Sequence, residues 1–290
     1  MNASSMLLSI RPDRPVDQVV VAIIRGVEEA AEGLQIPYFV AGATARDLLL
    51  THVFGIETGR ATRDVDFAVA LSGWAEFSTL RDRLVATEGF SPAGQAPHRL
   101  NYIHKNGVQY PLDLLPFRGV EEPPNTIAWP PDMKIMMNVI GYEEALATAV
   151  NVKVNGKTQV RVASLPGLAL LKLFAWLDRG MENAKDAQDL ATLFRNYPNA
   201  GNEDRIYGDE IAVLESLAYD MNLIGPRLLG MDVRRIAVGE TLKKALAALS
   251  DSKTRDRLSI HMAQQLGHAD DPYVAAVALL DQFKIGLEER

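Results

Sequence analysis

The sequence predicts an α+β fold, in which a lobe built on a mixed sheet with flanking helices precedes a helical C-terminal lobe. Over roughly the first 120 residues, short apolar runs alternate with helical patterns, which is typical of a mixed sheet covered by helices. Beyond residue 164, apolar positions recur almost entirely at helical spacing. We therefore expect a first lobe over 1–125, a connecting β extension over 126–163 and the helical lobe over 164–290.

The first elements are a helix, a strand and a second helix. Apolar residues at helical spacing predict a helix over 16–34, which stops near Gly33. The apolar run PYFVAG predicts a buried strand that ends at Gly42, and ATARDLLLTHVF favours a helix directly after it. A polar loop over 55–63 then leads into DVDFAVAL, which predicts a strand over 64–71.

The next segments predict a helix and a hairpin. A helix over 73–89 stops at Gly89, and strands over 98–105 and 108–117 are joined by the turn Asn106-Gly107. Two Pro-Pro pairs exclude regular structure over 118–134, which indicates a connecting loop. Short strands follow over 151–163, and the clearest helices after them are 165–179, 184–197, 208–222, 239–250 and 272–290.

Composition narrows the function classes. The 290 residues include 30 Lys and Arg against 37 Asp and Glu, which gives a net charge of −7, and no cysteine. Disulfides, thiolate metal sites and a cysteine nucleophile are therefore excluded. The first residues lack the basic and apolar regions of a signal peptide, and no apolar run reaches the roughly 18 residues of a membrane span. We expect a cytoplasmic protein without membrane contact, which binds any nucleic acid through a local basic groove.

Three carboxylates indicate a metal site. Asp64 and Asp66 are two residues apart on a predicted strand, so the pleat places both on one face. Asp113 stands in the apolar run PLDLLPF on a later strand, where an isolated buried charge is costly. If the two strands are neighbours, the three carboxylates converge on Mg²⁺ or Mn²⁺, as two-metal phosphoryl transfer requires. The alternative is that Asp64 only starts the strand and that Asp66 is a solvated edge residue.

A glycine turn precedes the acidic strand. In FVAGATARD a helix begins after Gly42-Ala43, and the free N–H groups at its start can bind phosphate. Arg46 lies one turn into this helix and adds positive charge. Ala43 itself supplies no hydroxyl to a phosphate, a role that Thr44 can take instead.

These residues, in this order, resemble the DNA polymerase β-type nucleotidyltransferase superfamily, whose pattern is a glycine turn with a helix, an acid-x-acid strand and a third acid on a later strand. GRATRDVDFAV with PLDLLPF is most similar to the AbiEii/AbiGii-type nucleotidyltransferases, which include toxins of toxin–antitoxin and abortive-infection systems. The later segments LALLKLFAWLDR and AKDAQDL resemble that family's lysine-bearing helix and K/R-D-x-x-D-L helix. They contribute Lys172, Lys185, Asp186 and Asp189.

The resemblance implies a polymerase β-like lobe and a Mg²⁺-dependent enzyme that moves NMP from an NTP to a hydroxyl of RNA, protein or a small molecule. It implies Asp64, Asp66, Asp113 and Lys172 as catalytic residues, the three aspartates as metal ligands, and Gly42, Ala43, Thr44, Arg46, Lys185, Asp186 and Asp189 as nucleotide-binding residues. It also implies a possible cognate antitoxin. The alternative function is that of a catalytically idle nucleotide-binding or interaction protein of the same fold, which Ala43 and the acidic pI favour.

Structural roles compete with several of these assignments. Lys185 and Asp189 are four apart on a helix and can form an ordinary intrahelical ion pair. The basic residues Arg60, Arg63, Arg99 and Lys105 can line an acceptor groove or form a solvated face. Trp74, Trp129 and Trp176 are most simply packing residues.

Overall fold

The structure is a computed structural model, which describes residues 7–59, 62–94, 96–156 and 158–289. It divides the chain into two compact units, Met1–Ser164 and Leu165–Arg290. The first unit combines a mixed sheet with helices and the second is helical, so the predicted α+β class is confirmed. The segment 126–163, predicted as a separate β extension, is counted with the first unit. None of the helices in the described ranges is both long and apolar enough to cross a membrane.

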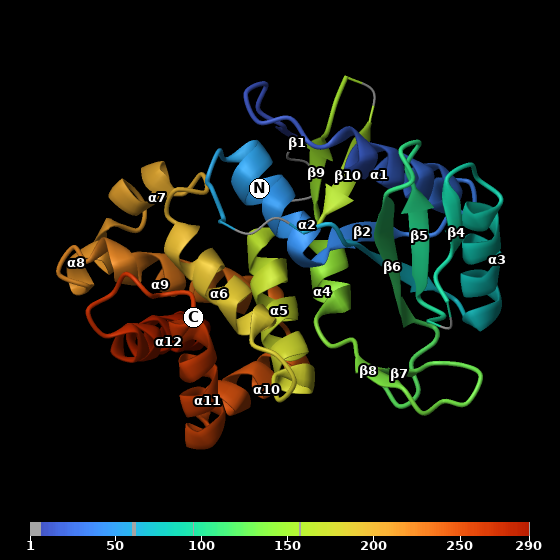
Figure 1. The fold of residues 1–290 in the computed structure, drawn as a ribbon. Helices are drawn as coiled ribbons and strands as arrows, with labels where there is room; N and C mark the ends of the chain where they lie inside the picture. Colours follow the sequence, from blue (N-terminus) through green and yellow to red (C-terminus); the bar gives the residue numbers. More distant parts are fainter. Residues whose placement is uncertain (1–6, 60–61, 95, 157, 290) are drawn as a thin grey trace. The chain divides into compact units, whose positions relative to one another are not determined.

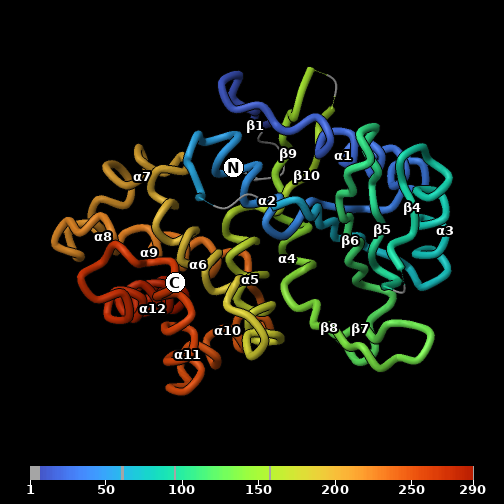
Figure 2. The backbone as a smooth tube through the Cα atoms, viewed as in Figure 1, coloured from blue at the N-terminus to red at the C-terminus, as the bar shows by residue number. Residues whose placement is uncertain are grey.

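The first unit is organised around an eight-stranded mixed sheet (Figure 1). Its strands, in chain order, are β1 (Leu7–Ser9), β2 (Tyr38–Ala41), β3 (Val65–Leu71), β4 (Phe90–Pro92), β5 (Arg99–Ile103), β6 (Gln109–Arg118), β9 (Val150–Lys153) and β10 (Gln159–Val162). Across the sheet their order is β1-β9-β10-β2-β3-β6-β5-β4. A separate two-stranded ribbon consists of β7 (Thr126–Ala128) and β8 (Met136–Asn138). Figure 2 shows β1 beside β9, far away in the sequence, with which it pairs in parallel.

Helices lie on both faces of this sheet. They are α1 (Gln18–Glu32), α2 (Gly42–Asp47), the π-helical turn η2 (Leu48–Val53), α3 (Trp74–Val85) and α4 (Tyr142–Ala147). On one face, Gly26 of α1 approaches the ring of Phe90, which meets Tyr102 edge to face with the ring centroids 5.0 Å apart. On the other face, Tyr142 of α4 packs against Phe39 and Phe117. The sheet core is therefore apolar on both faces.

Local sequence explains where α1 begins and why β3 is apolar along most of its length. The side chain of Asp17 accepts a hydrogen bond from the backbone N–H of Val19 and caps α1, as N-terminal aspartates commonly do. β3 is buried at every position except Asp66, which is half-buried. A central strand covered on both faces reads as such a continuous apolar run. Asp66 is therefore the one polar interruption in a buried strand.

The second unit is a set of packed helices. They are α5 (Leu165–Arg179), α6 (Lys185–Asn196), α7 (Glu203–Tyr207), α8 (Ile211–Ser216), α9 (Met221–Ile236), α10 (Gly239–Ser250), α11 (Ser252–Ala263) and α12 (Pro272–Glu288). The backbones of α9 and α12 meet closely, because a Cβ at Gly230 would lie 2.3 Å from the carbonyl oxygen of Phe283 and one at Gly286 would lie 2.2 Å from that of Arg227. Only glycine allows this approach.

The structure differs from the sequence predictions in several elements. The predicted loop 118–134 contains β7, and the predicted helix 208–222 is reduced to α8, because Ala218 and Tyr219 adopt positive φ angles that end it. The predictions missed β1, β4, β8 and α4, and within the region expected to be helical they did not single out α7, α9 or α11. All three of these strands have only three residues, too few for a period-two pattern to stand out. α9 carries Pro226, which reads as a helix breaker in sequence.

Candidate functional site: a charged row across the sheet

One row of residues across the sheet carries the predicted acidic site. β3 pairs in parallel with β6, which confirms that the two acidic strands are neighbours. Ala41 of β2 lies opposite Asp66 of β3, Asp66 lies opposite Asp113 of β6, and Asp113 lies opposite Arg99 of β5. Residues in one such row project from the same face of a sheet. Two carboxylates and one guanidinium therefore follow one another across three neighbouring strands.

Asp64 stands beside this row. It is two residues before Asp66, so the pleat directs both carboxylates to the same face, the one that also carries Phe39 and Phe117. Asp64 is exposed, whereas Asp66 is half-buried. The carbonyl oxygen of Asp64 accepts a hydrogen bond of 2.7 Å from the Thr44 hydroxyl. This bond ties the start of the acidic strand to α2.

The glycine turn lies directly against the acidic strand. Gly42 has a φ of +63°, a conformation that residues with a side chain rarely adopt. A Cβ at this position would lie 1.9 Å from Oδ2 of Asp66. Gly42 is therefore required twice, once for the backbone angle and once for the space that the Asp66 carboxylate occupies.

Asp113 is bound by Arg99. Arg99 donates from Nε to Oδ1 of Asp113 over 2.7 Å and from Nη2 to Oδ2 over 2.6 Å. These hydrogen bonds raise the pKa of the Arg99 guanidinium, and the charges of Asp113, Asp64 and Asp66 raise it further. Asp113 is 8% exposed, and a buried carboxylate with such a bidentate partner has the compensation that burial requires. From the sequence, Arg99 was interpreted as part of an acceptor groove or of a solvated face, and this contact was missed.

The predicted convergence of three carboxylates on one metal ion is not found in this conformation. Among the described residues, no group of three or more histidine, aspartate or glutamate side chains is arranged to hold a metal ion. The physical reason is the Arg99 guanidinium, which binds both oxygens of Asp113. Asp64 and Asp66 supply the oxygen donors that Mg²⁺ and Mn²⁺ prefer, and two carboxylates completed by substrate phosphates are a usual Mg²⁺ set. The donor chemistry of this pair fits a divalent cation.

Two residues predicted to contact the nucleotide make structural contacts. The Thr44 side chain is 5% exposed and its hydroxyl donates to the Asp64 carbonyl. Arg46 is 2% exposed, and its Nε and Nη2 donate to Oδ1 of Asp47 over 2.9 and 2.7 Å. Asp47 Oδ1 also accepts from the Thr58 hydroxyl. Both side chains therefore stabilise the local structure around the glycine turn. Ala43 follows Gly42 at the start of α2 and has no polar side-chain group.

The second unit holds a buried ionic cluster made of Lys172, Asp186 and Asp189, with the exposed Arg179 at its edge. Lys172 Nζ lies 2.9 Å from Oδ1 of Asp186 and 2.6 Å from Oδ2 of Asp189. Arg179 donates from Nε to Oδ2 of Asp186 over 2.8 Å. The structure thus brings together three of the four residues predicted on these two helices.

Burial and charge act in opposite directions on this cluster. Burial alone would lower the pKa of Lys172, but Asp189 and Asp186 raise it above its ordinary value. Burial alone would raise the pKa of Asp186, but Lys172 and Arg179 hold it below its ordinary value. Lys172 and Asp186 are therefore both ionised near neutral pH. Lys185 is exposed at the first position of α6, and the ion-pair partner found for Asp189 is Lys172 on α5.

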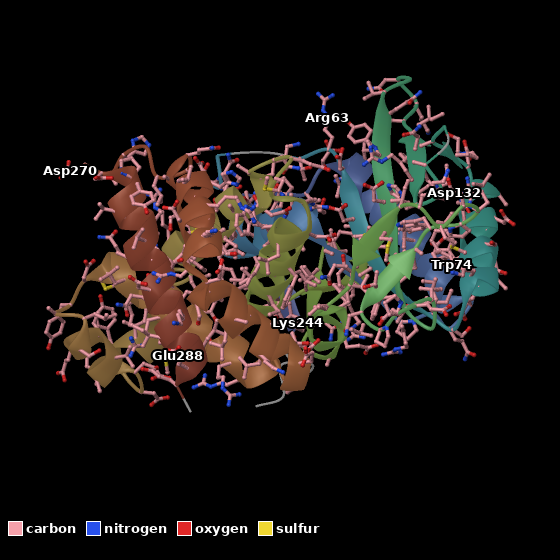
Figure 3. All side chains as sticks on the ribbon, turned by 90° about the horizontal axis from the view of Figure 1, so that it is seen from below. Arg63, Trp74, Asp132, Lys244, Asp270 and Glu288 are labelled. Atoms are coloured by element: carbon pink, nitrogen blue, oxygen red, sulfur yellow. The ribbon has the colours of Figure 1, made fainter. Side chains whose placement is uncertain are left out.

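The predicted basic groove is only partly assembled. Arg60 lies outside the described residues. Arg63 is exposed and projects away from the ribbon (Figure 3). Arg99 begins β5, whereas Lys105 lies beyond the other end of that strand. At about 3.3 Å per residue the two are some 20 Å apart along the strand, so these side chains do not gather around a single point.

The sequence matches the family described as "Nucleotidyl transferase AbiEii toxin, Type IV TA system" over residues 29–277. Among curated proteins, nothing matches. Solved structures that this chain matches include an antigenic nucleotidyltransferase-like protein from Paracoccidioides brasiliensis, with 16% identity over 70% of this chain and 93% of that chain and a TM-score of 0.42. The antibiotic-resistance factor ANT(2'')-Ia shows 15% identity over 70% of this chain and 99% of that chain, with a TM-score of 0.37. The Thermotoga maritima CCA-adding enzyme in complex with tRNA shows 11% identity over 95% of this chain and 83% of that chain, with a TM-score of 0.33.

The family match covers most of the chain and includes both the glycine turn with the acidic strands and the lysine-bearing helix. The ordered motifs seen in the sequence all lie within the matched residues. The chain is a member of the AbiEii toxin family of nucleotidyltransferases.

Proposed function

We propose that this protein transfers NMP from an NTP to a hydroxyl acceptor at the face of the sheet that carries Asp64 and Asp66, with Mg²⁺ or Mn²⁺ as cofactor. The observation that carries the proposal is the position of Asp66. Its carboxylate lies against Gly42 at the start of α2, in one row with Asp113 and Arg99. A phosphate-binding turn and an acidic pair are thus adjacent in space.

The cation belongs at Asp64 and Asp66. Two negative charges on one face repel each other unless a positive charge lies near them, and Arg99 is already engaged by Asp113. When bound, a divalent cation neutralises the phosphate oxygens and lowers the cost of charge that develops during transfer. The prediction that Asp113 is a third ligand stays open, because its oxygens would first have to leave Arg99.

The chain's own residues supply orientation. The backbone N–H groups that begin α2 after Gly42 suit the triphosphate, because the first N–H groups of a helix have no intrahelical acceptor. The Thr44 hydroxyl holds the Asp64 backbone, and Gly42 leaves room for the Asp66 carboxylate. Arg99 adds a fixed positive charge at the same row, where it can offset negative charge on the transferred phosphoryl group.

The reaction forms a bond from the acceptor oxygen to the α-phosphorus and breaks the bond from that phosphorus to the bridging oxygen of pyrophosphate. The acceptor hydroxyl loses its proton to a carboxylate or to water, and pyrophosphate leaves with the bonding electrons. Catalysis of this kind depends mainly on positioning and on neutralising charge. The row of charged side chains can supply both.

For Lys185, Asp186 and Asp189 the predicted nucleotide contact remains a proposal. The same holds for the predicted catalytic role of Lys172, which it would exert by contact with the triphosphate. The buried cluster around Lys172 supports a structural contribution to the helical unit. Exposed Lys185 is the member of this set whose ammonium group is free to reach a phosphate in solution.

The transfer proposal is tested by incubating purified protein with each α-labelled NTP, Mg²⁺, and either total RNA or a protein extract. We expect Mg²⁺-dependent label on one acceptor class, lost in Asp64→Asn/Asp66→Asn and retained in Asp132→Asn, which removes an exposed carboxylate elsewhere in the same unit. Nuclease and protease digestion of the product identify the acceptor as RNA or protein. Tight NTP binding without transfer to any acceptor would instead support the idle nucleotide-binding protein.

Family membership also suggests a toxin with a cognate antitoxin. We expect growth arrest on expression that depends on Asp66 and is relieved by an adjacent gene. Harmless expression of an active enzyme would contradict the toxin role while leaving the transfer chemistry intact.

A further inference from the structure

A cavity in the first unit lies away from the charged row. It has a volume of 370 Å³ and is lined by Trp74, Phe77, Ser78, Arg81, Gly94, Ala96, Pro97, Trp129, Pro130 and Pro131. Its walls come from α3, from the segment between β4 and β5, and from the segment that follows β7. In Figure 3, Trp74 is labelled on α3 and Asp132 marks the loop that continues from Pro131.

Helix packing separates this cavity from the charged row. Tyr102 is three residues after Arg99 on β5, so it and its partner Phe90 on β4 project from the opposite face. On that face Gly26 of α1 approaches Phe90, and Arg83 of α3 lies against Gly33 at the end of α1. The cavity, which α3 lines, therefore lies on the face covered by α1 and α3. The ring of His98, in the turn before β5, lies 5.1 Å from that of Trp129.

The cavity walls offer flat aromatic surface. The ring centroids of Trp74 and Trp129 are 5.4 Å apart, and Phe77 lies 5.8 Å from Trp74 and 5.7 Å from Trp129. Trp129 is 3% exposed, so its position is fixed by packing. Proline side chains close the remaining wall with little loss of conformational entropy. Such a wall favours a planar ring system, as aromatic platforms in nucleic-acid-binding proteins do.

One basic side chain in the lining has a buried nitrogen without a hydrogen-bond acceptor among the described residues. Within the described part of the chain, Arg81 Nε is buried and has no hydrogen-bond partner, and the same holds for Nδ1 of His98 behind Trp129. A buried donor without an acceptor is destabilising unless a ligand or water completes it. The nearby Asp132 lies 3.6 Å from Lys134, so this acid already has a cationic neighbour. A guanidinium group in this state suits a phosphate or another planar anion.

We propose that this cavity is a binding site for a mononucleotide, with the base against the half-buried ring of Trp74, which Trp129 supports from within, and the phosphate on Arg81. The volume lies at the small end of the roughly 300–1,000 Å³ typical of small-molecule sites, which accommodates one nucleotide and excludes a duplex. The site lies on the opposite face of the sheet from Asp66, so it binds a nucleotide other than the one that undergoes transfer. The proposal does not depend on the transfer activity.

Tryptophan fluorescence tests the site directly, because two of the chain's three tryptophans line it. The protein used is Asp64→Asn/Asp66→Asn in the presence of a chelator, so that nucleotide bound with a cation at the charged row does not contribute. AMP, GMP, CMP and UMP are titrated separately. We expect saturable quenching by at least one of them. Adenosine and inorganic phosphate, titrated alone, should each bind at least about tenfold more weakly than the mononucleotide.

Arg81→Gln should raise the dissociation constant about tenfold or more, since it removes a charge-assisted contact to the phosphate. Arg83→Gln is the matched control, because Arg83 is on the same helix and does not line the cavity. Arg81→Lys keeps the charge and should be intermediate, and circular dichroism checks that each variant is folded. Absence of saturable quenching with all four nucleotides, or equal affinity of Arg81→Gln and the parent, would overturn the proposal. So would a proline-rich peptide that binds the cavity when no mononucleotide does.

Discussion

Arg99 binds both carboxylate oxygens of Asp113, and both residues stand in the same cross-sheet row as Asp66. The arginine thus neutralises the acid that the sequence pattern suggested as a metal ligand. This contact divides the three acids into two groups. Asp64 and Asp66 form a pair near solvent, whereas Asp113 is buried and bound by Arg99. The division has a measurable consequence for cation binding.

We expect Asp113→Asn to weaken Mn²⁺ binding about tenfold, because Arg99 is then released toward Asp64 and Asp66 and opposes the cation. Arg99→Gln added to Asp113→Asn should restore the affinity to within a few-fold of the parent. Mn²⁺ titration followed by electron paramagnetic resonance measures both variants without any assay of activity.

Asp66→Asn is the reference for loss of a direct ligand in this experiment and should weaken binding regardless of Arg99. A double variant that binds Mn²⁺ as weakly as Asp113→Asn alone would show that Asp113 is itself a ligand. The predicted three-carboxylate site would then form only when the cation displaces Arg99.

Gly42→Ala should reduce transfer about 100-fold or more. The added Cβ would meet the Asp66 carboxylate at 1.9 Å, so that carboxylate must move out of its position, and small displacements of catalytic groups have effects of this size. Gly59→Ala is a matched control, since Gly59 also has a positive φ but nothing lies within 4 Å of its added Cβ. Steady-state rates with each NTP check the pair. Similar losses in both variants would indicate backbone strain rather than displacement of Asp66.

The sequence predicted the acidic strands and the glycine turn because each is a local pattern. It could not predict that Arg99 binds Asp113, since this requires the pairing of β5 with β6 in one register. The same limit applies to the helical unit. Asp186 and Asp189 are three apart on α6 and so share a face, but the ammonium between them comes from Lys172 on another helix.

The contact of α9 with α12 shows a further reason why parts of the fold could not be predicted. In sequence, Gly230 and Gly286 read as weak points in helices, because glycine has a low helix propensity. In the structure they are the positions where the two backbones touch. The aromatic cavity could likewise not be predicted from the sequence, because its residues come from three separate segments. Their tryptophans were interpreted only as packing residues.

Lys172→Met should destabilise the helical unit by about 3–5 kcal/mol, because it leaves the buried carboxylate of Asp189 without the ammonium group that compensates its charge. Urea denaturation measures this, with Trp74→Phe/Trp129→Phe as background so that Trp176 of α5 is the only tryptophan. Lys185→Met, an exposed lysine at the start of α6, should change the free energy of unfolding by less than about 0.5 kcal/mol.

Lys172→Met/Asp189→Leu removes both charges and should recover much of the lost stability, since Arg179 still compensates Asp186. A stable double variant then allows NTP affinity to be measured without the folding defect. Wild-type affinity in that variant would assign Lys172 a structural role, whereas weak binding by a well-folded variant would support its predicted contact with the triphosphate.

The pH dependence of stability should also report this cluster. The pKa of Asp186 is held below its ordinary value of 3.8 in the folded protein, so its contribution is fully present above 3.8 and is lost as the pH falls through the lower folded value. The pKa of Lys172 is raised above 10.5, so its contribution is fully present below 10.5 and is lost as the pH rises through the folded value. The stability difference between the parent and Asp186→Asn should therefore be constant between about pH 5 and 9 and shrink below pH 4. Urea midpoints at each pH give this difference directly, and a difference that grows as the pH falls below 4 would contradict the ionic pairing of Asp186.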